Sequence, residues 1–290
     1  MRPIIDLVRR AALFCLVPLV SCVSFLEAAD KTPATLLLKD TLIAPGQPAR
    51  VEARLSTKSL LSTMGLGGEL LELIVEGKVV ATGMTGGDGR AFLTYHPTAQ
   101  GVIPIQVRVG RSPRVLPTEG QANVVAWERR NPILAIEVAA LMEARKGENP
   151  LSGIGSVLES ERTPMPDAAD ELAKLTQFHY RVMYVATVQS TNADSLLTTA
   201  EIRAWLTRHK FPPGYIVVLP PGESVWVAKI DELHGAGWKG LKTGIGRSKA
   251  FAEAFLQRRL EVVVISDSAT GEVPRKAAVA KEWKEVRKKL

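Results

Sequence analysis

The sequence predicts a β-sandwich followed by an α/β unit with a mostly parallel sheet, preceded by an export signal. From about residue 35 to residue 127, apolar and polar residues alternate, which is the period of a strand with one buried face. From Pro132 onward, short apolar segments alternate with helical segments of about ten residues, a pattern typical of right-handed crossovers and parallel sheets. The first 30 residues have a different composition and are excluded from both folds.

Residues 1–30 are interpreted as a signal peptide. Three arginines stand among the first ten residues and precede the apolar run Ala11–Val20. This run is shorter than the roughly 20 residues of a membrane-spanning helix, and small residues follow it, as in secretory signals. Leu19-Val20-Ser21-Cys22 resembles the bacterial lipobox, whose cysteine becomes the lipidated first residue of the mature chain. We therefore expect an exported lipoprotein of the cell envelope, periplasmic or at the outer surface, held on the membrane by lipidated Cys22. The alternatives are cleavage near Ala28 with free secretion, and a retained anchor.

Charge and cysteine content narrow the class of protein. The net charge of +7 is concentrated in residues 275–289, with seven Lys or Arg against two Glu, and in the first 22 residues. The remainder is about neutral, so we expect no nucleic-acid partner. Cys15 and Cys22 are the only cysteines, so a chain cleaved before Cys22 contains no internal disulfide and depends on packing for its stability.

The predicted sandwich covers residues 31–128. Arg50–Leu55 alternates strictly, and glycine-rich Gly86–Gly89 is a turn signal. About seven strands at roughly ten-residue spacing predict an antiparallel sandwich. The hairpin formed by Arg90–Tyr95 and Val102–Val109 resembles the last hairpin of bacterial immunoglobulin-like modules, so the sandwich is expected to be immunoglobulin-like.

The second unit is predicted to cover residues 131–290. Its expected strands are 133–138, 182–186, 215–219, 241–245 and 261–265, and its expected helices are 168–178, 199–209, 225–234 and 248–258. A closing basic helix is expected over about 275–290, because Val279, Trp283, Val286 and Leu290 form one apolar stripe. We expect this stripe to pack on the sheet of its own domain; contact with a membrane surface is the alternative.

Four segments of the second unit occur in an order that resembles a known family. They are Thr163–Pro166, Arg181–Ala186, Thr199–Leu206 and Phe211-Pro212-Pro213-Gly214. This order resembles the haloacid-dehalogenase-type (HAD) phosphatases, and among them the lipin and actin-patch phosphatidate phosphatase branch. The resemblance spans about residues 132–267 and implies a HAD-like Rossmannoid fold. In active members it implies an aspartate nucleophile, a second acid two residues later, and acidic ligands for Mg²⁺.

The residues that would perform this chemistry are largely replaced. Aligned on the first strand, the nucleophile position is Ala135 and the second acid is Glu137. Lys229 stands where the family has its phosphate-binding lysine, and Arg247 and Lys249 occupy the last loop, where an aspartate is expected. We therefore expect a pseudo-phosphatase with Glu137 and Lys229 as remnants of the site, no metal site and no cofactor.

The same replacements predict an anion site. Lys229, Arg247 and Lys249 are expected to converge at the N-terminus of the helix that begins near Ser248. Free N–H groups and the helix dipole favour anions there. We expect Lys229, Arg247, Ser248 and Lys249 to bind a phosphate-bearing or acidic ligand without a metal.

Three functions remain open from the sequence. The first is an exported, lipid-anchored binding or scaffolding protein on a catalytically degenerate phosphatase fold. The second is an active phosphatase on a lipid phosphate or another phosphomonoester, using Glu137, Asp267 and Mg²⁺. The third is an adhesion or carbohydrate-binding sandwich, which requires an exposed aromatic platform from Phe92, Tyr95 or Trp127. The run 235–240 matches G-x-G-x-x-G, but it follows a helix and precedes a strand, the reverse of the dinucleotide fingerprint.

Overall fold

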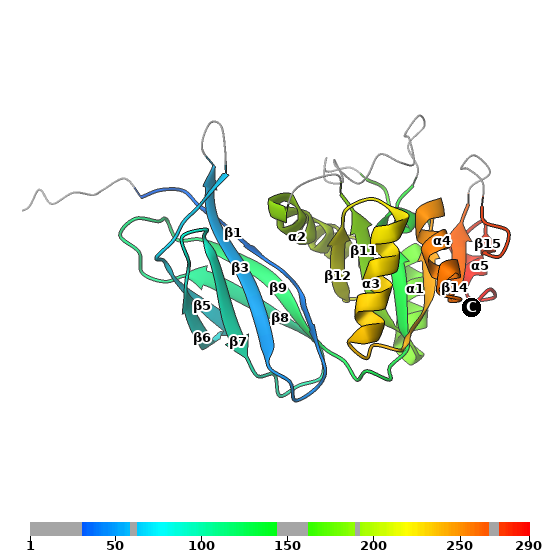
Figure 1. Cartoon of the computed structure of the whole chain (residues 1–290), viewed down its shortest axis with the longest axis horizontal. Helices are drawn as coiled ribbons and strands as arrows, with labels where there is room; N and C mark the ends of the chain where they lie inside the picture. The colour runs from blue at the N-terminus through cyan, green and yellow to red at the C-terminus, as the bar shows by residue number, and fades with distance from the viewer. Residues whose placement is uncertain (1–30, 59–62, 144–161, 189–191, 267–272) are drawn as a thin grey trace, which may run out of the picture.

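The computed structural model describes residues 31–58, 63–143, 162–188, 192–266 and 273–290 (Figure 1). The expected signal peptide, its Cys22 and the alternative catalytic Asp267 lie outside these residues. The described chain is rich in sheet, with nine strands before Trp127 and a parallel sheet with helices after it. Within the described residues, no helix is both long enough and apolar enough to cross a membrane.

The first nine strands form two sheets. They are β1 (Thr35–Leu38), β2 (Thr41–Ile43), β3 (Ala49–Lys58), β4 (Thr63–Gly65), β5 (Leu70–Val75), β6 (Lys78–Met84), β7 (Arg90–Tyr95), β8 (Gly101–Val109) and β9 (Glu119–Ala126). One sheet has β3 at its centre, paired antiparallel with β1, β4 and β7. The other has the order β2-β9-β8-β5-β6, with β2 parallel to β9 and the other pairs antiparallel.

Alternate residues from both sheets meet in one apolar core, because successive side chains of a strand point to opposite faces. Val51, Leu55, Leu73, Leu93 and Val107 are fully buried in it. The strict alternation of the sequence is therefore confirmed as the pattern of a two-sheet sandwich.

The second part of the chain continues with a 3₁₀ turn, strands and helices. They are β10 (Ile133–Glu137), η1 (Val138–Leu141), α1 (Ala168–Phe178), β11 (Arg181–Thr187), α2 (Asn192–Arg208), β12 (Tyr215–Leu219), α3 (Glu223–Gly235), β13 (Leu241–Gly246), α4 (Lys249–Gln257), β14 (Glu261–Ile265), β15 (Ala278–Ala280) and α5 (Trp283–Val286). The six strands form one parallel sheet in the order β12-β11-β10-β13-β14-β15.

Helices cover both faces of the parallel sheet. Residues of α1, α2 and α5 share one core cluster with Leu134 and Ile136 of β10, whereas residues of α3 and α4 share the other with Ile133 and Ala135. Both faces of β10 are thus buried, which explains why its sequence is a continuous apolar run. The second cluster also includes Val125 and Trp127, so the end of the sandwich packs into the same core.

In the α/β part, most elements before residue 266 lie within two residues of their predicted bounds, but α2 begins at Asn192, seven residues before the predicted helix. The sandwich has nine strands where about seven were expected, and the predicted closing helix is wrong. Residues 278–280 instead form β15 at the edge of the sheet, and only Trp283–Val286 is helical. Trp283 and Val286 are fully buried, as expected for packing on their own sheet, whereas Val279 is 41% exposed. A strand at 278–280 extends the sheet beside β14, and this tertiary pairing overrides the helical spacing of the sequence.

Candidate functional site

The parallel sheet has a topological switch point between β10 and β13. From β10 the chain adds β11 and β12 on one side, and later β13, β14 and β15 on the other. Open α/β sheets bind ligands outside the carboxyl ends of the strands at such a point. The end of β10 and the start of α4 are therefore where a ligand site is expected.

The side chain of Glu137 occupies this expected ligand site. It is the last residue of β10, and it is only 3% exposed. Its Oε2 accepts a hydrogen bond from the N–H of Arg247 at 2.6 Å and another from the N–H of Ser248 at 2.8 Å. A carboxylate at a helix N-terminus satisfies free N–H donors and interacts favourably with the helix dipole. Glu137 thus occupies the place of an external anion.

Two neighbouring residues fix this arrangement. The Ser248 hydroxyl accepts a hydrogen bond from the N–H of Phe251 at 3.2 Å, which makes Ser248 the N-cap of α4. A Cβ atom on Gly246 would lie 2.9 Å from Glu137 Oε2 and 2.2 Å from a ring carbon of Phe251. Glycine is therefore required for the close approach of β13 to the carboxylate.

The structure places the four residues of the expected anion site, Lys229, Arg247, Ser248 and Lys249, on α3 and at the start of α4. The N–H groups of Arg247 and Ser248 are already bonded to Glu137. Lys229 lies in the middle of α3, where its Nζ pairs with Glu232 at 2.7 Å along the same helix. Lys249 Nζ lies 3.8 Å from Glu253 and its side chain is 54% exposed. The described contacts thus connect Lys229 and Lys249 to carboxylates of their own helices, whereas the Arg247 guanidinium donates to the Met165 sulfur at 3.4 Å.

Ala135, which aligns with the nucleophile of the family, is not at the end of its strand. Ala135 lies in the middle of β10, fully buried among residues that pack against α3 and α4. The residue at the carboxyl end of the strand is Glu137, and on the neighbouring strand it is Thr187. Within the described residues, no group of three or more His, Cys, Asp or Glu side chains is arranged to hold a metal ion.

A second buried carboxylate, Asp40, joins the sandwich to the α/β part. It lies between β1 and β2, and its side chain has no exposed surface. Its Oδ1 accepts from the Arg203 guanidinium of α2 and from the Asn123 N–H at 2.8 Å, and its Oδ2 accepts from the Ile216 N–H at 3.1 Å. Burial raises the pKa of Asp40, whereas Arg203 and the two N–H donors act in the opposite direction. This network fixes β12 and α2 against the edge of the sandwich.

Beside Asp40, a cavity of about 570 Å³ lies between the two parts of the chain. The sandwich contributes residues of β5, β8 and β9, and the α/β part contributes Arg203 and Phe211-Pro212-Pro213-Gly214. The Tyr184 hydroxyl donates to the Pro212 carbonyl at 2.6 Å, which fixes the proline segment against β11. The most specific segment of the family resemblance is therefore placed against the sandwich.

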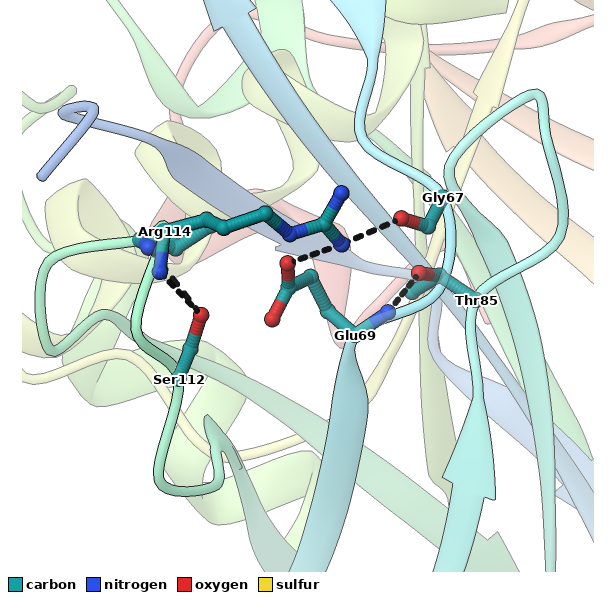
Figure 2. Close-up of polar contacts among 6 residues, drawn as sticks. Gly67, Glu69, Thr85, Ser112 and Arg114 are labelled. Carbon is teal, nitrogen blue, oxygen red and sulfur yellow. Dashed lines mark hydrogen bonds and ion pairs between the residues drawn. The ribbon is translucent and has the colours of Figure 1, made fainter.

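At one end of the sandwich, Glu69 and Arg114 join three loops (Figure 2). The side chain of Glu69 is 5% exposed, and its Oε1 lies 2.5 Å from Arg114 Nη2, which also donates to the Gly67 carbonyl at 2.9 Å. The Glu69 N–H donates to the Thr85 hydroxyl at 2.9 Å, and the Arg114 N–H donates to the Ser112 hydroxyl at 3.1 Å. These contacts hold the loops before β5, after β6 and between β8 and β9.

The aromatic residues of the sandwich do not support a binding platform. Trp127 is buried in the core cluster shared with the α/β part. Tyr95 is partly buried against the sandwich core. Phe92 is 47% exposed, but the Arg50 guanidinium lies over its ring, 4.0 Å from the centroid. The adhesion alternative therefore gains no support from these side chains.

The sequence did not reveal Asp40 or Glu69 as buried carboxylates. Asp40 follows β1 by two residues and Glu69 directly precedes β5, so each resembles an ordinary turn acid. Their partners lie far along the chain, 163 residues away for Arg203 and 45 for Arg114. The only sequence signal is the adjacent apolar run, which does not identify the partner.

Comparisons with known proteins do not assign the chain to a family. No protein-family model and no curated protein matches it. A chimeric titin Z1Z2 carrying an exogenous decorin peptide is 17% identical, with 33% of this chain and 94% of that chain covered, at a TM-score of 0.23. Titin M3 is 15% identical over 32% of this chain and 95% of that chain, also at 0.23. An L-2-haloacid dehalogenase is 11% identical over 55% of this chain and 98% of its own, at 0.33. These weak likenesses are compatible with a β part and an α/β part, but scores this low carry no argument about fold or activity.

Proposed function

We propose that this protein is an exported, lipid-anchored binding or scaffolding protein built on a phosphatase-like scaffold without phosphatase chemistry. The observation that carries the proposal is the Glu137 carboxylate at the start of α4, bonded to the N–H groups of Arg247 and Ser248. A phosphoryl group would need those donors, and the chain uses them for itself.

The topology supports the two finer fold assignments within this proposal. A parallel sheet with its first strand in the interior and helices on both faces is a doubly wound arrangement, which agrees with a HAD-like scaffold. In the sandwich, β3 and β7 belong to one sheet and β5, β8 and β9 to the other. This division of strands is typical of immunoglobulin-like sandwiches.

Two buried contacts hold the two parts of the chain together, and this fixed arrangement favours a binding or scaffolding role. Asp40 accepts hydrogen bonds from both parts of the chain, and Trp127 is buried in the core that they share. The cavity of about 570 Å³ beside Asp40 has the size of a small-ligand site, and such sites are common between domains. Because the two parts are held in one arrangement, the cavity between them would keep one shape and be preformed for a ligand.

Phosphate release tests the absence of catalysis. The purified mature chain is assayed with Mg²⁺ on p-nitrophenyl phosphate and phosphatidate, with Glu137→Gln and Lys229→Ala as matched variants. We expect wild type and both variants to give the same background rate. Turnover by wild type that disappears in Glu137→Gln would establish the active phosphatase instead.

Fractionation of cells tests the anchor. The proposal expects wild-type protein in the membrane fraction and Cys22→Ala in the soluble fraction, because acylation at Cys22 supplies the stable membrane attachment. A wild-type protein that is soluble and begins near Ala28 would refute lipid anchoring without affecting the rest of the proposal.

A further inference from the structure

A second cavity, of about 650 Å³, lies at the opposite edge of the parallel sheet from Glu137. It is lined by the residues that directly precede four strands, namely Pro132, Tyr180, Gly240 and Leu260. These strands, β11, β10, β13 and β14, are consecutive neighbours in the sheet. The cavity therefore lies below the centre of the sheet, at the amino-terminal ends of its strands.

The lining of this amino-edge cavity is strongly cationic. Lys239, Lys242 and Arg259 line it together with two histidines, and Glu261 is the only acid. Among the described residues, no carboxylate lies within ion-pair distance of the three permanent cations. Glu261 accepts a hydrogen bond from the Thr243 hydroxyl at 3.4 Å. Three cations against one carboxylate in the lining produce a positive local potential that favours anions.

The backbone around the cavity is well fixed. The Gly240 carbonyl accepts from the Ile133 N–H at 2.9 Å, and a Cβ on Gly240 would lie 1.9 Å from the Asn131 carbonyl oxygen. His234 Nε2 lies 2.8 Å from the Leu241 carbonyl oxygen. Because a carbonyl only accepts, Nε2 carries the hydrogen of that bond. Lys239 therefore stands in a turn whose course is set by close contacts, and Lys242 follows it in β13.

We propose that the amino-edge cavity binds a phosphate or sulfate group through Lys239, Lys242 and Arg259. Lysine and arginine make charge-assisted hydrogen bonds to such oxyanions, and the cavity volume is in the range of small-ligand sites. The inference rests on the proposed function in one respect, since it assumes a ligand that is bound and not hydrolysed. It moves the anion site from the carboxyl edge of the sheet to the amino edge.

Helix dipoles offer a rival explanation for part of the lining. The helices α1, α3 and α4 all end at this edge, and a helix C-terminus favours nearby cations. This effect accounts for His179, His234 and Arg259, which stand at helix ends. It does not account for Lys242, which lies within β13, or for Lys239, four residues beyond α3.

Calorimetric titration of the mature chain in EDTA tests the site. The probes are inorganic phosphate, sulfate and glycerol phosphate, which separate a free anion from an ester, and chloride at equal ionic strength is the reference. The test variant is Lys239→Ala/Lys242→Ala, and Lys229→Ala/Lys249→Ala removes the same charge from α3 and α4 elsewhere. Glu261→Gln removes the single acid of the cavity.

We expect saturable binding to wild type, weaker by about tenfold or more in the test variant and unchanged in the control. Glu261→Gln should bind the anions a few times more tightly than wild type, because the substitution removes the one carboxylate that repels them. Equal affinity in the test and control variants, or the absence of saturable binding to wild type, would overturn the proposal and leave the helix dipoles as the explanation. Phosphate released from glycerol phosphate would instead refute the proposed function, and it is measured separately in the same samples.

Discussion

Replacing Glu137 by glutamine is the perturbation that depends most directly on the geometry of the switch point. The change keeps the size of the side chain and removes its charge. Hydrogen bonds to a charged acceptor contribute about 1.5–3 kcal/mol each, against about 0.5–1.5 kcal/mol for neutral ones. With two such bonds, to the N–H groups of Arg247 and Ser248, the loss is about 2–3 kcal/mol. The weaker interaction with the α4 dipole adds about 0.3–1 kcal/mol.

The assay is unfolding of the mature chain, followed by tryptophan fluorescence in urea and on heating. Because 1 kcal/mol shifts the Tm of a chain of this size by about 2–4 °C, we expect Glu137→Gln to lower the Tm by about 5–15 °C. Glu137→Asp should also be destabilised, because the shorter side chain keeps its charge but does not reach both N–H groups.

The matched control is Glu232→Gln on α3. Its carboxylate is 65% exposed and pairs with Lys229 along the helix, and exposed pairs contribute about 0–1 kcal/mol. A Glu137→Gln protein with the same Tm as this control would refute the idea that Glu137 stabilises the start of α4.

Three further substitutions test other parts of the structure. Asp40→Ala leaves the Arg203 guanidinium without its buried partner and should lower the free energy of unfolding by about 3–5 kcal/mol. A decrease below about 1 kcal/mol in urea unfolding, the size typical of an exposed ion pair, would contradict this. Glu171 has a lowered pKa because it accepts a hydrogen bond from Lys174, so its stabilisation is present above the unfolded pKa and is lost as pH falls through the folded pKa. Glu171→Gln should therefore be less stable than wild type at pH 7, and its free energy of unfolding should fall less on acidification. If the free energies of variant and wild type fall in parallel with pH, the Glu171–Lys174 pair does not stabilise the fold. Gly214→Ala would place a Cβ 2.4 Å from a carbonyl oxygen of β11 and should cost about 1–3 kcal/mol in unfolding, and a neutral result would show that the segment moves aside.

The periodic segments were predictable because burial and hydrophobicity coincide in them. The bounds of α1, β7, β12 and β14 match the sequence prediction, since α1 has one apolar stripe, β7 alternates, and β12 and β14 are continuous apolar runs. The last helix failed for a related reason. The spacing of Val279 and Trp283 suits one helical face, but strand pairing with β14 places them on two separate elements.

The candidate site was less predictable than the fold. An alignment on the first strand does not reveal where the strand ends, so the sequence did not show that Ala135 lies in the middle of β10 and that Glu137 is its last residue. The bond between Glu137 and the start of α4 joins residues 110 positions apart, and no local pattern indicates it. The cations of the amino edge were missed because Arg259 is 17 residues after Lys242 in the sequence and reaches the same cavity only through the pairing of β13 with β14.

The central claim is that the carboxyl edge of the sheet is closed by Glu137 and takes no phosphate. Its most direct test is a phosphate titration of the isotope-labelled mature chain, followed by the backbone amide resonances of Arg247 and Ser248 in heteronuclear NMR. The account predicts that these two resonances stay in place while those of Gly240 and Lys242, at the amino edge, shift with saturation. Saturable shifts of Arg247 and Ser248 would show that phosphate displaces Glu137, and would contradict the account.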